Sequence, residues 1–289
     1  MSIEHKECIM ITVTGATGQL GRLVLESLAA RVPASEITAA VRNPDKAGDL
    51  AAKGVRVVRA DYNDPASLAS AFAGTDRLLV ISGNEFGQRV EQYERIVAAA
   101  RQAGVGYIAY TSILRADENP MYLAQDHKAA EALIAASGIP HAFLRNGWYS
   151  ENYTASMQGG AAHGAFIGAA GAGRIATAPR ADYAEAAAVV VAEGREGVFE
   201  LGGAPFTMDD LAVTISRATG QPVAYRNLPP DVYAAELQGF GVPPGMAQAL
   251  ADSDRHAADG WLDTPSRDLE TLIGRPPAPM SETVKALLG

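Results

Sequence analysis

Short apolar runs alternate with longer helical patterns along the first half of the chain. The strand-like runs occupy residues 9–13, 37–41, 55–58, 78–81, 107–112 and 142–144. Segments with helical spacing separate them at residues 20–28, 46–53, 64–72, 88–103 and 127–136. Regular alternation of strand and helix predicts a parallel sheet with helices on both faces. Because crossovers in such sheets are right-handed, we expect an α/β fold with a Rossmann-type doubly wound parallel sheet.

The pattern changes after Arg145. Residues 159–173 hold six glycines and many alanines, which predicts a mobile or closely packed loop. Later segments predict a helix at 181–193, a strand at 198–201, a helix capped by Thr207 and an edge strand at 222–228.

Two domains follow from this change. We expect residues 1–150 to form the Rossmann domain, with residues 179–201 returning to it. Residues 151–289 would form mainly a smaller C-terminal α/β cap domain over the crevice, where a substrate would bind.

Composition and charge narrow the classes of function. The chain has 289 residues, of which 48% are hydrophobic and 20% charged, as in an ordinary globular protein. A formal net charge of −9, spread along the chain, argues against nucleic acid and anionic membranes as partners. Cys8 is the single cysteine, so neither an intrachain disulfide nor a CxxC metal site can form, and we expect no metal. The polar start and the lack of a run of about 18 apolar residues predict a cytoplasmic protein.

A glycine-rich segment follows the first predicted strand. Residues 14–21 read Thr-Gly-Ala-Thr-Gly-Gln-Leu-Gly, so the glycines have the spacing GxxGxxG. Gly15 permits a tight turn, Gly18 lets the backbone approach a pyrophosphate, and Gly21 lets helix and strand pack closely. The next helix offers unpaired N–H groups and the positive end of its dipole to the phosphates. The place at a strand–helix junction favours a dinucleotide site over a turn that merely needs glycine.

The end of the second predicted strand distinguishes the two nicotinamide cofactors. NAD-dependent enzymes usually place an Asp or Glu there to bind the ribose 2′-hydroxyl. This chain lacks that acid and has Arg42, whose guanidinium can pair with the 2′-phosphate of NADPH. The alternative is a solvated surface arginine. Because the acid is missing as well, the sequence favours NADPH.

Two further strand ends carry candidate cofactor contacts. Asp61, at the end of the third strand, either bonds the adenine amine or caps the next helix. Five residues follow the fourth strand at the carboxyl edge of the sheet: Ser82, Gly83, Asn84, Glu85 and Phe86. Small side chains at that edge would let the adenosine and pyrophosphate lie close to the backbone.

A segment near the domain boundary adds a family resemblance. Residues 144–153 read Leu-Arg-Asn-Gly-Trp-Tyr-Ser-Glu-Asn-Tyr, and with the glycine-rich segment they resemble the NmrA-like group of atypical short-chain dehydrogenases/reductases. Within that group the likeness is greatest to the type 2 NAD(P)H:quinone oxidoreductases and somewhat smaller to the triphenylmethane reductases. The likeness spans nearly the whole chain, and residues 144–153 are its specific part.

The resemblance implies which residues line NADPH. They are Gly15, Ala16, Thr17, Gly18, Gln19, Leu20, Arg42, Asn84, Glu85, Phe86, Asn146, Gly147, Trp148, Tyr149, Ser150 and Glu151. It also implies a nicotinamide pocket between the Rossmann domain and the cap. There Trp148, Tyr149 and Tyr153 would stack on a flat aromatic substrate, unless they only pack at the domain junction.

One departure from short-chain dehydrogenases at large concerns the proton donor. Those enzymes typically carry Tyr-x-x-x-Lys ahead of the helix that follows the fifth strand. Here Leu123 stands at the tyrosine position and His127 at the lysine position. Tyr122 and Lys128 each miss by one residue, so the usual acid is absent. The candidate catalytic residues are His127, which is otherwise a helix-surface histidine, and Tyr149.

Three functions fit these features. The first is hydride transfer from NADPH to a small-molecule quinone. The second is a redox-sensing regulator of the NmrA-like kind, which binds NAD(P)H without turnover. The third is reduction of triphenylmethane or azo dyes. The specific segment at residues 144–153 favours the quinone oxidoreductase, and a homo-oligomer is compatible with all three.

Overall fold

The structure, a computed structural model, describes residues 8–83 and 89–289. It divides into two compact units of nearly equal length. Unit 1 comprises the described residues of the ranges Met1–Ser112, Ala129–Leu144 and Ala184–Phe199. Unit 2 comprises Ile113–Lys128, Arg145–Tyr183 and Glu200–Gly289. The chain therefore alternates between the units along its sequence.

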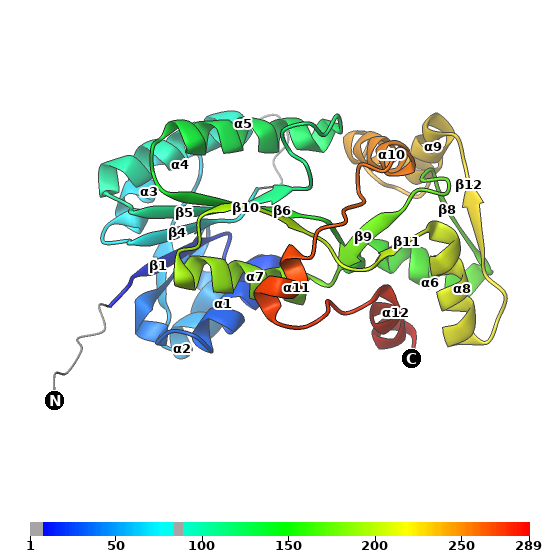
Figure 1. Cartoon of the computed structure of the whole chain (residues 1–289), viewed down its shortest axis with the longest axis horizontal. Coiled ribbons are helices and arrows are strands. Elements are labelled where there is room, and N and C mark those ends of the chain that lie inside the picture. The colour runs from blue at the N-terminus through cyan, green and yellow to red at the C-terminus, as the bar shows by residue number, and fades with distance from the viewer. Residues whose placement is uncertain (1–7, 84–88) are drawn as a thin grey trace. The chain divides into compact units, whose positions relative to one another are not determined.

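The main sheet has seven strands in the order β10-β6-β5-β4-β1-β2-β3 (Figure 1). They are β1 (Ile11–Thr14), β2 (Ile37–Val41), β3 (Arg56–Arg59), β4 (Arg77–Val80), β5 (Tyr107–Ile113), β6 (His141–Asn146) and β10 (Gly197–Leu201). The pairs β1–β2, β1–β4, β2–β3 and β4–β5 are parallel, and Ile11 lies opposite both Ile37 and Arg77. The predicted Rossmann-type sheet is confirmed. Its strand order reverses between β1 and β4, and ligands of such sheets bind at the carboxyl ends beside that point.

Helices cover both faces of this sheet. On one side lie α3 (Pro65–Phe72), α4 (Arg89–Ala103) and α5 (Tyr122–Ala136), and on the other lie α1 (Gln19–Ala29) and α7 (Arg180–Glu193). Leu68 and Phe72 of α3 and Ile96 of α4 pack with the strand residues Leu78 and Ile108 in one buried cluster. Each such side chain contributes about 1.5–3 kcal/mol when it is fully buried. The apolar spacing that predicted the helices thus marks the faces that cover the sheet.

The helix expected at residues 46–53 forms as two short pieces. A 3-10 helix, η2, spans Pro44–Ala47, and α2 spans Gly48–Ala52. The side chain of Asn43 accepts from the backbone N–H of Asp45, so the turn begins before the predicted helix. Another 3-10 helix, η1, spans Ala34–Glu36 ahead of β2.

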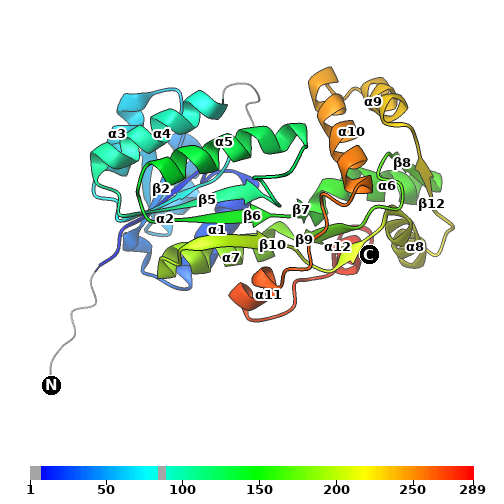
Figure 2. The ribbon, with the colours of Figure 1, turned by 45° about the horizontal axis from the view of Figure 1, so that its top comes forward.

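Unit 2 has two small sheets and six helices within the described residues, besides η3 (Ser150–Tyr153). Its strands are β7 (Trp148–Tyr149), β8 (Ala165–Gly168), β9 (Ile175–Ala178), β11 (Pro205–Phe206) and β12 (Ala224–Asn227), ordered β11-β9-β7 and β12-β8. Its helices are α6 (Thr154–His163), α8 (Met208–Thr219), α9 (Pro230–Gly239), α10 (Pro244–Ala258), α11 (Asp268–Ile273) and α12 (Met280–Leu288). Helices α9 and α10 pack side by side, as both ribbon views show (Figure 2).

The predicted cap of α8 is confirmed in detail. Thr207 Oγ1 accepts from the backbone N–H of Asp210, and the Asp210 carboxylate accepts from the backbone N–H of Thr207. This reciprocal capping box satisfies two N–H groups at the start of the helix. The edge strand expected at 222–228 is also present, as β12.

The prediction of a loop over residues 159–173 is wrong for much of its length. The segment holds the end of α6 and all of β8. Gly164 ends α6 with a φ of 71°, which glycine adopts without strain. A side chain on Gly160 would place its Cβ 3.0 Å from Val223, so glycine there serves close packing. Glycine and alanine content therefore did not mark a loop here.

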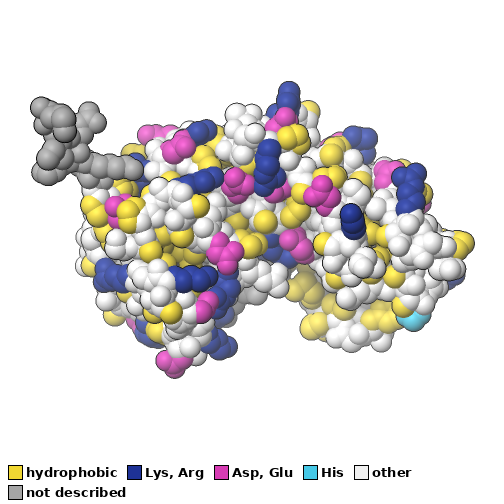
Figure 3. Space-filling model, turned by 90° about the horizontal axis from the view of Figure 1, so that it is seen from below, with side chains coloured by type: hydrophobic (Ala, Val, Ile, Leu, Met, Phe, Trp, Pro, Cys, Tyr) yellow, Lys and Arg dark blue, Asp and Glu magenta, His cyan; other side chains and the backbone are white. Residues whose placement is uncertain are grey.

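Within residues 8–83 and 89–289, no helix is long and apolar enough to cross a bilayer. The described part of the chain also has no group of three or more His, Cys, Asp or Glu side chains arranged to hold a metal ion. Lys and Arg side chains are interspersed with Asp and Glu on the face that Figure 3 shows. That face has no continuous basic surface of the kind that binds nucleic acid.

Candidate functional site

The glycine-rich segment forms the turn between β1 and α1 in unit 1. Gly15 has a φ of +61°, in the region that favours glycine, and the N–H of Gly18 donates to the Gly15 carbonyl at 2.9 Å. A Cβ on Gly21 would lie 2.3 Å from the Gly15 carbonyl oxygen, so only glycine lets α1 pack on this turn. The roles predicted for Gly15 and Gly21 therefore have a structural basis.

Exposure divides the seven loop residues into two groups. Gly15, Gly18 and Gln19 are exposed and Thr17 is half-buried, so their backbone is accessible to a ligand. The other three loop residues are buried and form the support of the turn: Ala16, Leu20 and Gly21. Gly18 is the N-cap of α1, and no side chain of the described residues caps this helix. Its first N–H groups are thus left to solvent or to an anion.

The residues expected around the adenosine lie in the loops after β2 and β3. Arg42 is exposed directly after β2. Asp61 is half-buried, and its Oδ1 accepts from the backbone N–H of Asn63 at 2.9 Å. The cap of α3 is Asp64, which accepts from the N–H groups of Ala66 and Ser67, so the alternative reading of Asp61 as a helix cap is wrong.

The segment after β4 is described only in part. Ser82 and Gly83 are half-buried, and the N–H of Ser82 donates to Thr111 Oγ1 at 2.9 Å. Three further predicted contacts lie outside the described residues: Asn84, Glu85 and Phe86. A residue that the sequence reasoning did not single out, Tyr62, lies beside this segment, 3.8 Å from where a Cβ on Gly83 would be. Its only sequence signal is its place next to Asp61.

In unit 2, the segment from Asn146 to Tyr149 makes a tight corner. The N–H of Gly147 donates to the Leu201 carbonyl at 2.7 Å, and a Cβ there would lie 2.6 Å from the Ala176 carbonyl oxygen. Asn146 Nδ2 donates to the Tyr149 hydroxyl at 3.3 Å, while Asn146 Oδ1 is buried without a partner among the described residues. A buried amide oxygen without a partner is costly, so this corner fits a ligand that donates a hydrogen bond.

Tyr149 is held by two neighbours. Its ring contacts Tyr183 edge to face with centroids 5.3 Å apart, and the Arg180 guanidinium lies 4.7 Å from its centroid. Burial raises the pKa of Tyr149, so its hydroxyl stays protonated at neutral pH. Trp148 is half-buried and pairs in register with Thr177, and it packs against the core of unit 2.

The last two residues of the predicted stretch have structural contacts. Glu151 accepts from the backbone N–H of Arg180, with both carboxylate oxygens within 3.1 Å, and so caps α7. Ser150 is fully buried, and its hydroxyl has no partner among the described residues. The same holds for the hydroxyls of Thr177 and Tyr183, which the sequence reasoning did not single out. Their place beside the site is visible only in the fold, where Thr177 pairs with Trp148 and the Tyr183 ring contacts Tyr149.

The two expectations about the proton donor have different outcomes. His127 is 9% exposed, so its reading as a helix-surface histidine is wrong. Tyr122 is 59% exposed, and its backbone N–H donates to Asp252. Lys128 is exposed and donates to the Asp117 carbonyl. Neither Tyr122 nor Lys128 is placed as a buried proton donor.

A buried acid in unit 1 was also missed. Ser112, near the end of β5, donates from its hydroxyl to Glu131 Oε1 at 2.6 Å, and both residues are buried. Glu131 lies four residues after His127 on α5, and this helical spacing is a signal that could have revealed it.

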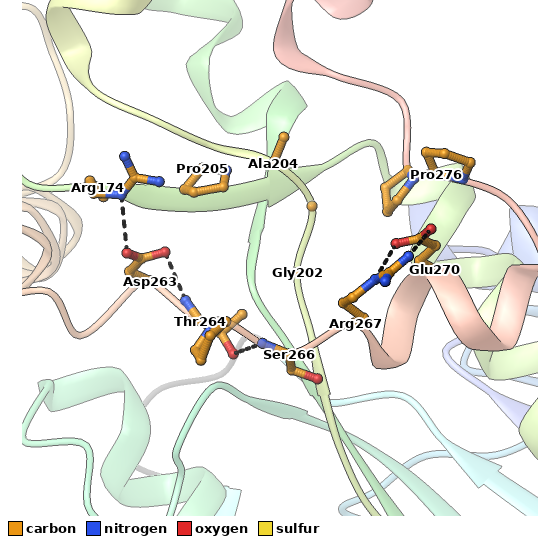
Figure 4. A pocket seen from close by; sticks show the side chains of 13 residues that line it. Arg174, Gly202, Ala204, Pro205, Asp263, Thr264, Ser266, Arg267, Glu270 and Pro276 are labelled. Carbon is orange, nitrogen blue, oxygen red and sulfur yellow. Dashed lines mark hydrogen bonds and ion pairs between the residues drawn. The ribbon is translucent and has the colours of Figure 1, made fainter.

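The structure also has an open pocket of about 510 Å³ within unit 2 (Figure 4). None of the predicted site residues lines it. Its charged side chains are paired, Arg174 with Asp263 at 3.3 Å and Arg267 with Glu270 at 2.7 Å. The pocket therefore offers no unpaired charge to a ligand.

The sheet and the glycine turn together show the class of fold to which the chain belongs. A parallel sheet whose first strand enters a helix through such a turn is a dinucleotide-binding Rossmann fold. The sequence of residues 8–273 matches the NmrA-like family, and the chain belongs to that family. The resemblance seen in the sequence is thereby confirmed.

Known proteins resemble the chain over nearly its full length. Quinone oxidoreductase 2 of Escherichia coli (strain K12) is 51% identical over 281 residues, 96% of this chain and 98% of that protein. A crystal structure of NADPH-dependent quinone oxidoreductase from Escherichia coli, complexed with NADPH, has a TM-score of 0.95 at 50% identity and covers 97% of this chain and 100% of that one. The crystal structure of Citrobacter sp. triphenylmethane reductase complexed with NADP(H) has a TM-score of 0.90 at 40% identity, covering 96% and 100%.

Proposed function

We propose that this protein is an NADPH-dependent oxidoreductase that transfers a hydride to quinones. The observation that carries the proposal is the open glycine turn at the start of α1, which no side chain of the described residues caps, beside the point where the strand order reverses. The full-length likeness to quinone oxidoreductase 2 supports quinones as the substrate class. The likeness to triphenylmethane reductase supports cationic dyes as a second substrate class.

The cofactor contacts follow from exposure and chemistry. In unit 1, backbone groups of Gly15, Thr17, Gly18 and Gln19 hold the pyrophosphate, and Arg42 pairs with the 2′-phosphate. The adenosine lies against the half-buried residues of the neighbouring loops: Asp61, Ser82 and Gly83, with Asn84, Glu85 and Phe86 following. The glycine turn fits this role because Gly15 adopts a φ of +61° and because Gly18, exposed at the N-terminus of α1, has no side chain to keep a phosphate from the backbone.

The segment at residues 146–151 supplies the contacts to the nicotinamide. Asn146 Oδ1, which has no hydrogen-bond partner among the described residues, accepts from the carboxamide N–H. Gly147, Trp148 and Tyr149 form the adjoining surface. Ser150 and Glu151 support it, because Glu151 ties the segment to the start of α7.

The protein's chemical task is positioning. When bound, NADPH supplies the hydride. The residues of this chain hold the nicotinamide and a flat quinone face to face, so that proximity contributes most of the rate. Tyr149 is protonated and held by Tyr183 and Arg180, which suits a hydroxyl that orients the quinone. His127 is the second candidate for contact with substrate.

The chain acts on a small molecule, and we propose a reducing cytoplasm as its location. The single cysteine, Cys8, is exposed and forms no disulfide in the structure. The net charge of −9 disfavours binding to nucleic acid or to anionic membranes. We also predict that the protein self-associates into a homo-oligomer, which light scattering can test by measuring its mass in solution.

The test is NADPH oxidation by the purified protein with a benzoquinone, a naphthoquinone and a triphenylmethane dye as acceptors. We expect quinone-dependent loss of NADPH absorbance at a rate proportional to protein concentration. A protein that binds NADPH tightly but oxidises none of it with any acceptor would instead be a redox sensor. Turnover with the dye and none with quinones would reassign the substrate class.

A further inference from the structure

One tyrosine joins three loops at the carboxyl ends of the sheet in unit 1. The Tyr62 hydroxyl forms hydrogen bonds with Thr14 Oγ1 at 2.6 Å and with the Ile81 carbonyl oxygen at 3.0 Å. The N–H of Ile81 donates to Thr14 Oγ1 at 3.0 Å, which closes a ring of three hydrogen bonds. Tyr62 follows β3, Thr14 ends β1 and Ile81 follows β4. The loops after three strands are thus fixed through a single hydroxyl.

This ring lies at the base of the glycine turn. Thr14 directly precedes Gly15, and a Cβ on Gly15 would lie 3.4 Å from Ile81 Cβ. Ile81 directly precedes Ser82 and Gly83, and a Cβ on Gly83 would lie 3.8 Å from Cε2 of the Tyr62 ring. A shift of Ile81 would therefore move both the start of the turn and the segment after β4.

Tyr62 also differs from a tyrosine that merely fills the core. Its side chain is half-buried and packs against the buried cluster under α3 and α4. The positive charge of Arg42, which we assign to the 2′-phosphate, acts on the Tyr62 hydroxyl. Burial raises the pKa of Tyr62, so the ring of hydrogen bonds persists across the neutral pH range.

We propose that Tyr62 is a positioning residue for the dinucleotide, because it fixes the Gly15 turn against the Ser82–Gly83 segment. The proposal rests on the proposed function, since it takes the glycine turn as the cofactor site. Tyr62 acts on a part of the site common to NADPH and NADH. It has no part in hydride transfer itself.

The test is Tyr62→Phe, with cofactor affinity measured by titration of nicotinamide fluorescence. We expect the Kd values for NADPH and NADH to rise together by about tenfold, as for the loss of a buried hydrogen bond. The kcat at saturating NADPH should change by less than about twofold, so that the effect falls on KM. Equal loss for both cofactors separates Tyr62 from Arg42, whose loss should weaken NADPH alone.

The matched control is Tyr107→Phe. Tyr107 begins β5 and is buried, and its hydroxyl donates to the Arg195 carbonyl at the opposite end of the sheet. Both variants remove a tyrosine hydroxyl from unit 1, so thermal melts compare their cost to stability. Only Tyr62→Phe should weaken the cofactor.

A double-mutant cycle with Thr14→Val tests the ring of hydrogen bonds. Because either substitution breaks the same ring of hydrogen bonds, the NADPH affinity of the double variant should be about equal to that of the single variant with the lower affinity. Additive losses, unchanged affinity in Tyr62→Phe, or a loss confined to NADPH would each overturn the proposal. Failure of the wild-type protein to bind either cofactor would overturn the proposed function instead.

Discussion

Two stretches of this chain are rich in glycine, and they differ in what their backbone N–H groups do. In the turn at residues 15–21, the N-terminus of α1 has no side-chain cap within the described residues. In the stretch at residues 159–173, three successive N–H groups are taken by side chains. Ala169 donates to Asp254, Ala170 to the Tyr225 hydroxyl and Gly171 to Asn227.

The difference teaches that glycine content alone does not identify a ligand loop. In the first stretch, Gly15 forms the turn at the carboxyl end of β1 that leads into an N-terminus of α1 without a side-chain cap among the described residues, whereas Gly160 in the second stretch allows close packing. In the second stretch, side chains of α10 and β12 accept hydrogen bonds from the backbone N–H groups, as a bound anion would do in the first stretch. The first N–H groups of α1, which no side chain of the described residues caps, are what phosphate binding requires.

The largest expected effect comes from Gly18→Val. A Cβ at this position would lie 3.1 Å from the Gly15 carbonyl oxygen, and the branched side chain would fill the space above the turn. We expect NADPH affinity to fall by more than about a hundredfold while the fold survives. Fluorescence titration measures the affinity, and circular dichroism checks the fold.

The second stretch offers the matched control, Gly159→Ala. No atom lies within 4 Å of a Cβ added there, and the residue is inside α6. NADPH affinity should stay unchanged, with a small gain in stability because alanine favours helix over glycine. Tight NADPH binding by a folded Gly18→Val protein would show that the first stretch is only a turn.

The next effect in size concerns the choice of cofactor. Arg42→Ala removes a charge-assisted hydrogen bond to the 2′-phosphate, worth about 1.5–3 kcal/mol. NADPH affinity should fall by roughly 10- to 150-fold, with NADH nearly unchanged. Lys53→Ala, an exposed cation of the same unit, controls for net charge. Equal losses for both cofactors in Arg42→Ala would remove the assignment.

A smaller effect is expected at His127. Reducing a ketone makes a strongly basic alkoxide that needs a proton donor. The hydroquinone anion is a much weaker base, because its conjugate acid is about as acidic as a phenol, and it can take its proton from water. The protein should reduce quinones but not ordinary ketones, and His127→Ala should lower kcat by less than about a hundredfold.

The measurement is a panel of quinones and ketones at several pH values, with the exposed His163→Ala as control. Robust ketone reduction would reveal a proton donor that we have not recognised. A collapse of His127→Ala beyond about a thousandfold, with cofactor binding intact, would lead to the same conclusion.

The smallest effect is a pH dependence of stability, which comes from Asp254, the side chain that binds Ala169 of the second stretch. Burial raises the pKa of Asp254 from 3.8 to about 6, although it accepts from the Ala169 N–H. Since the folded pKa is the higher one, protonation stabilises the fold below pH 3.8, and that contribution is lost as the pH rises through about 6. Asp254→Asn should remove this fall, so its melting temperature should exceed that of the wild type by more at pH 8 than at pH 5.

Asp210→Asn is the control of opposite sign. The hydrogen bonds from Thr207 lower the pKa of Asp210, so this carboxylate stabilises the fold above its unfolded pKa and less as the pH falls. A pH-independent difference between wild type and Asp254→Asn would contradict the burial of an ionised Asp254.

Much of the fold could be predicted because its signals are local. Apolar periodicity located the strands and helices of the main sheet, and Thr207 with Asp210 marked the start of α8. The glycine turn was recognisable because it lies between β1 and α1. The stretch at residues 159–173 was predicted wrongly because Gly160 and Gly164 pack closely against Val223 and Pro222. These contacts join residues far apart in the sequence, so the local pattern does not reveal them.

The site was less predictable than the fold. The pairing of Ser112 with Glu131 and the ring around Tyr62 depend on contacts between strands, which no periodicity reveals. Asp64 and not Asp61 caps α3, and which of the two does so depends on the residue at which the helix begins. The orphaned Asn146 oxygen becomes visible only when its neighbours are in place.

The central claim is hydride transfer from bound NADPH to a quinone, and a single-turnover measurement tests it most directly. Protein saturated with NADPH is mixed with one equivalent of a naphthoquinone without oxygen, and both products are quantified. The account predicts hydroquinone and NADP⁺ in equal amounts, formed at a rate that slows when the transferred hydrogen is deuterium, and none with Gly18→Val. NADPH that stays bound and unoxidised in the presence of the quinone would contradict the account and identify the protein as a sensor.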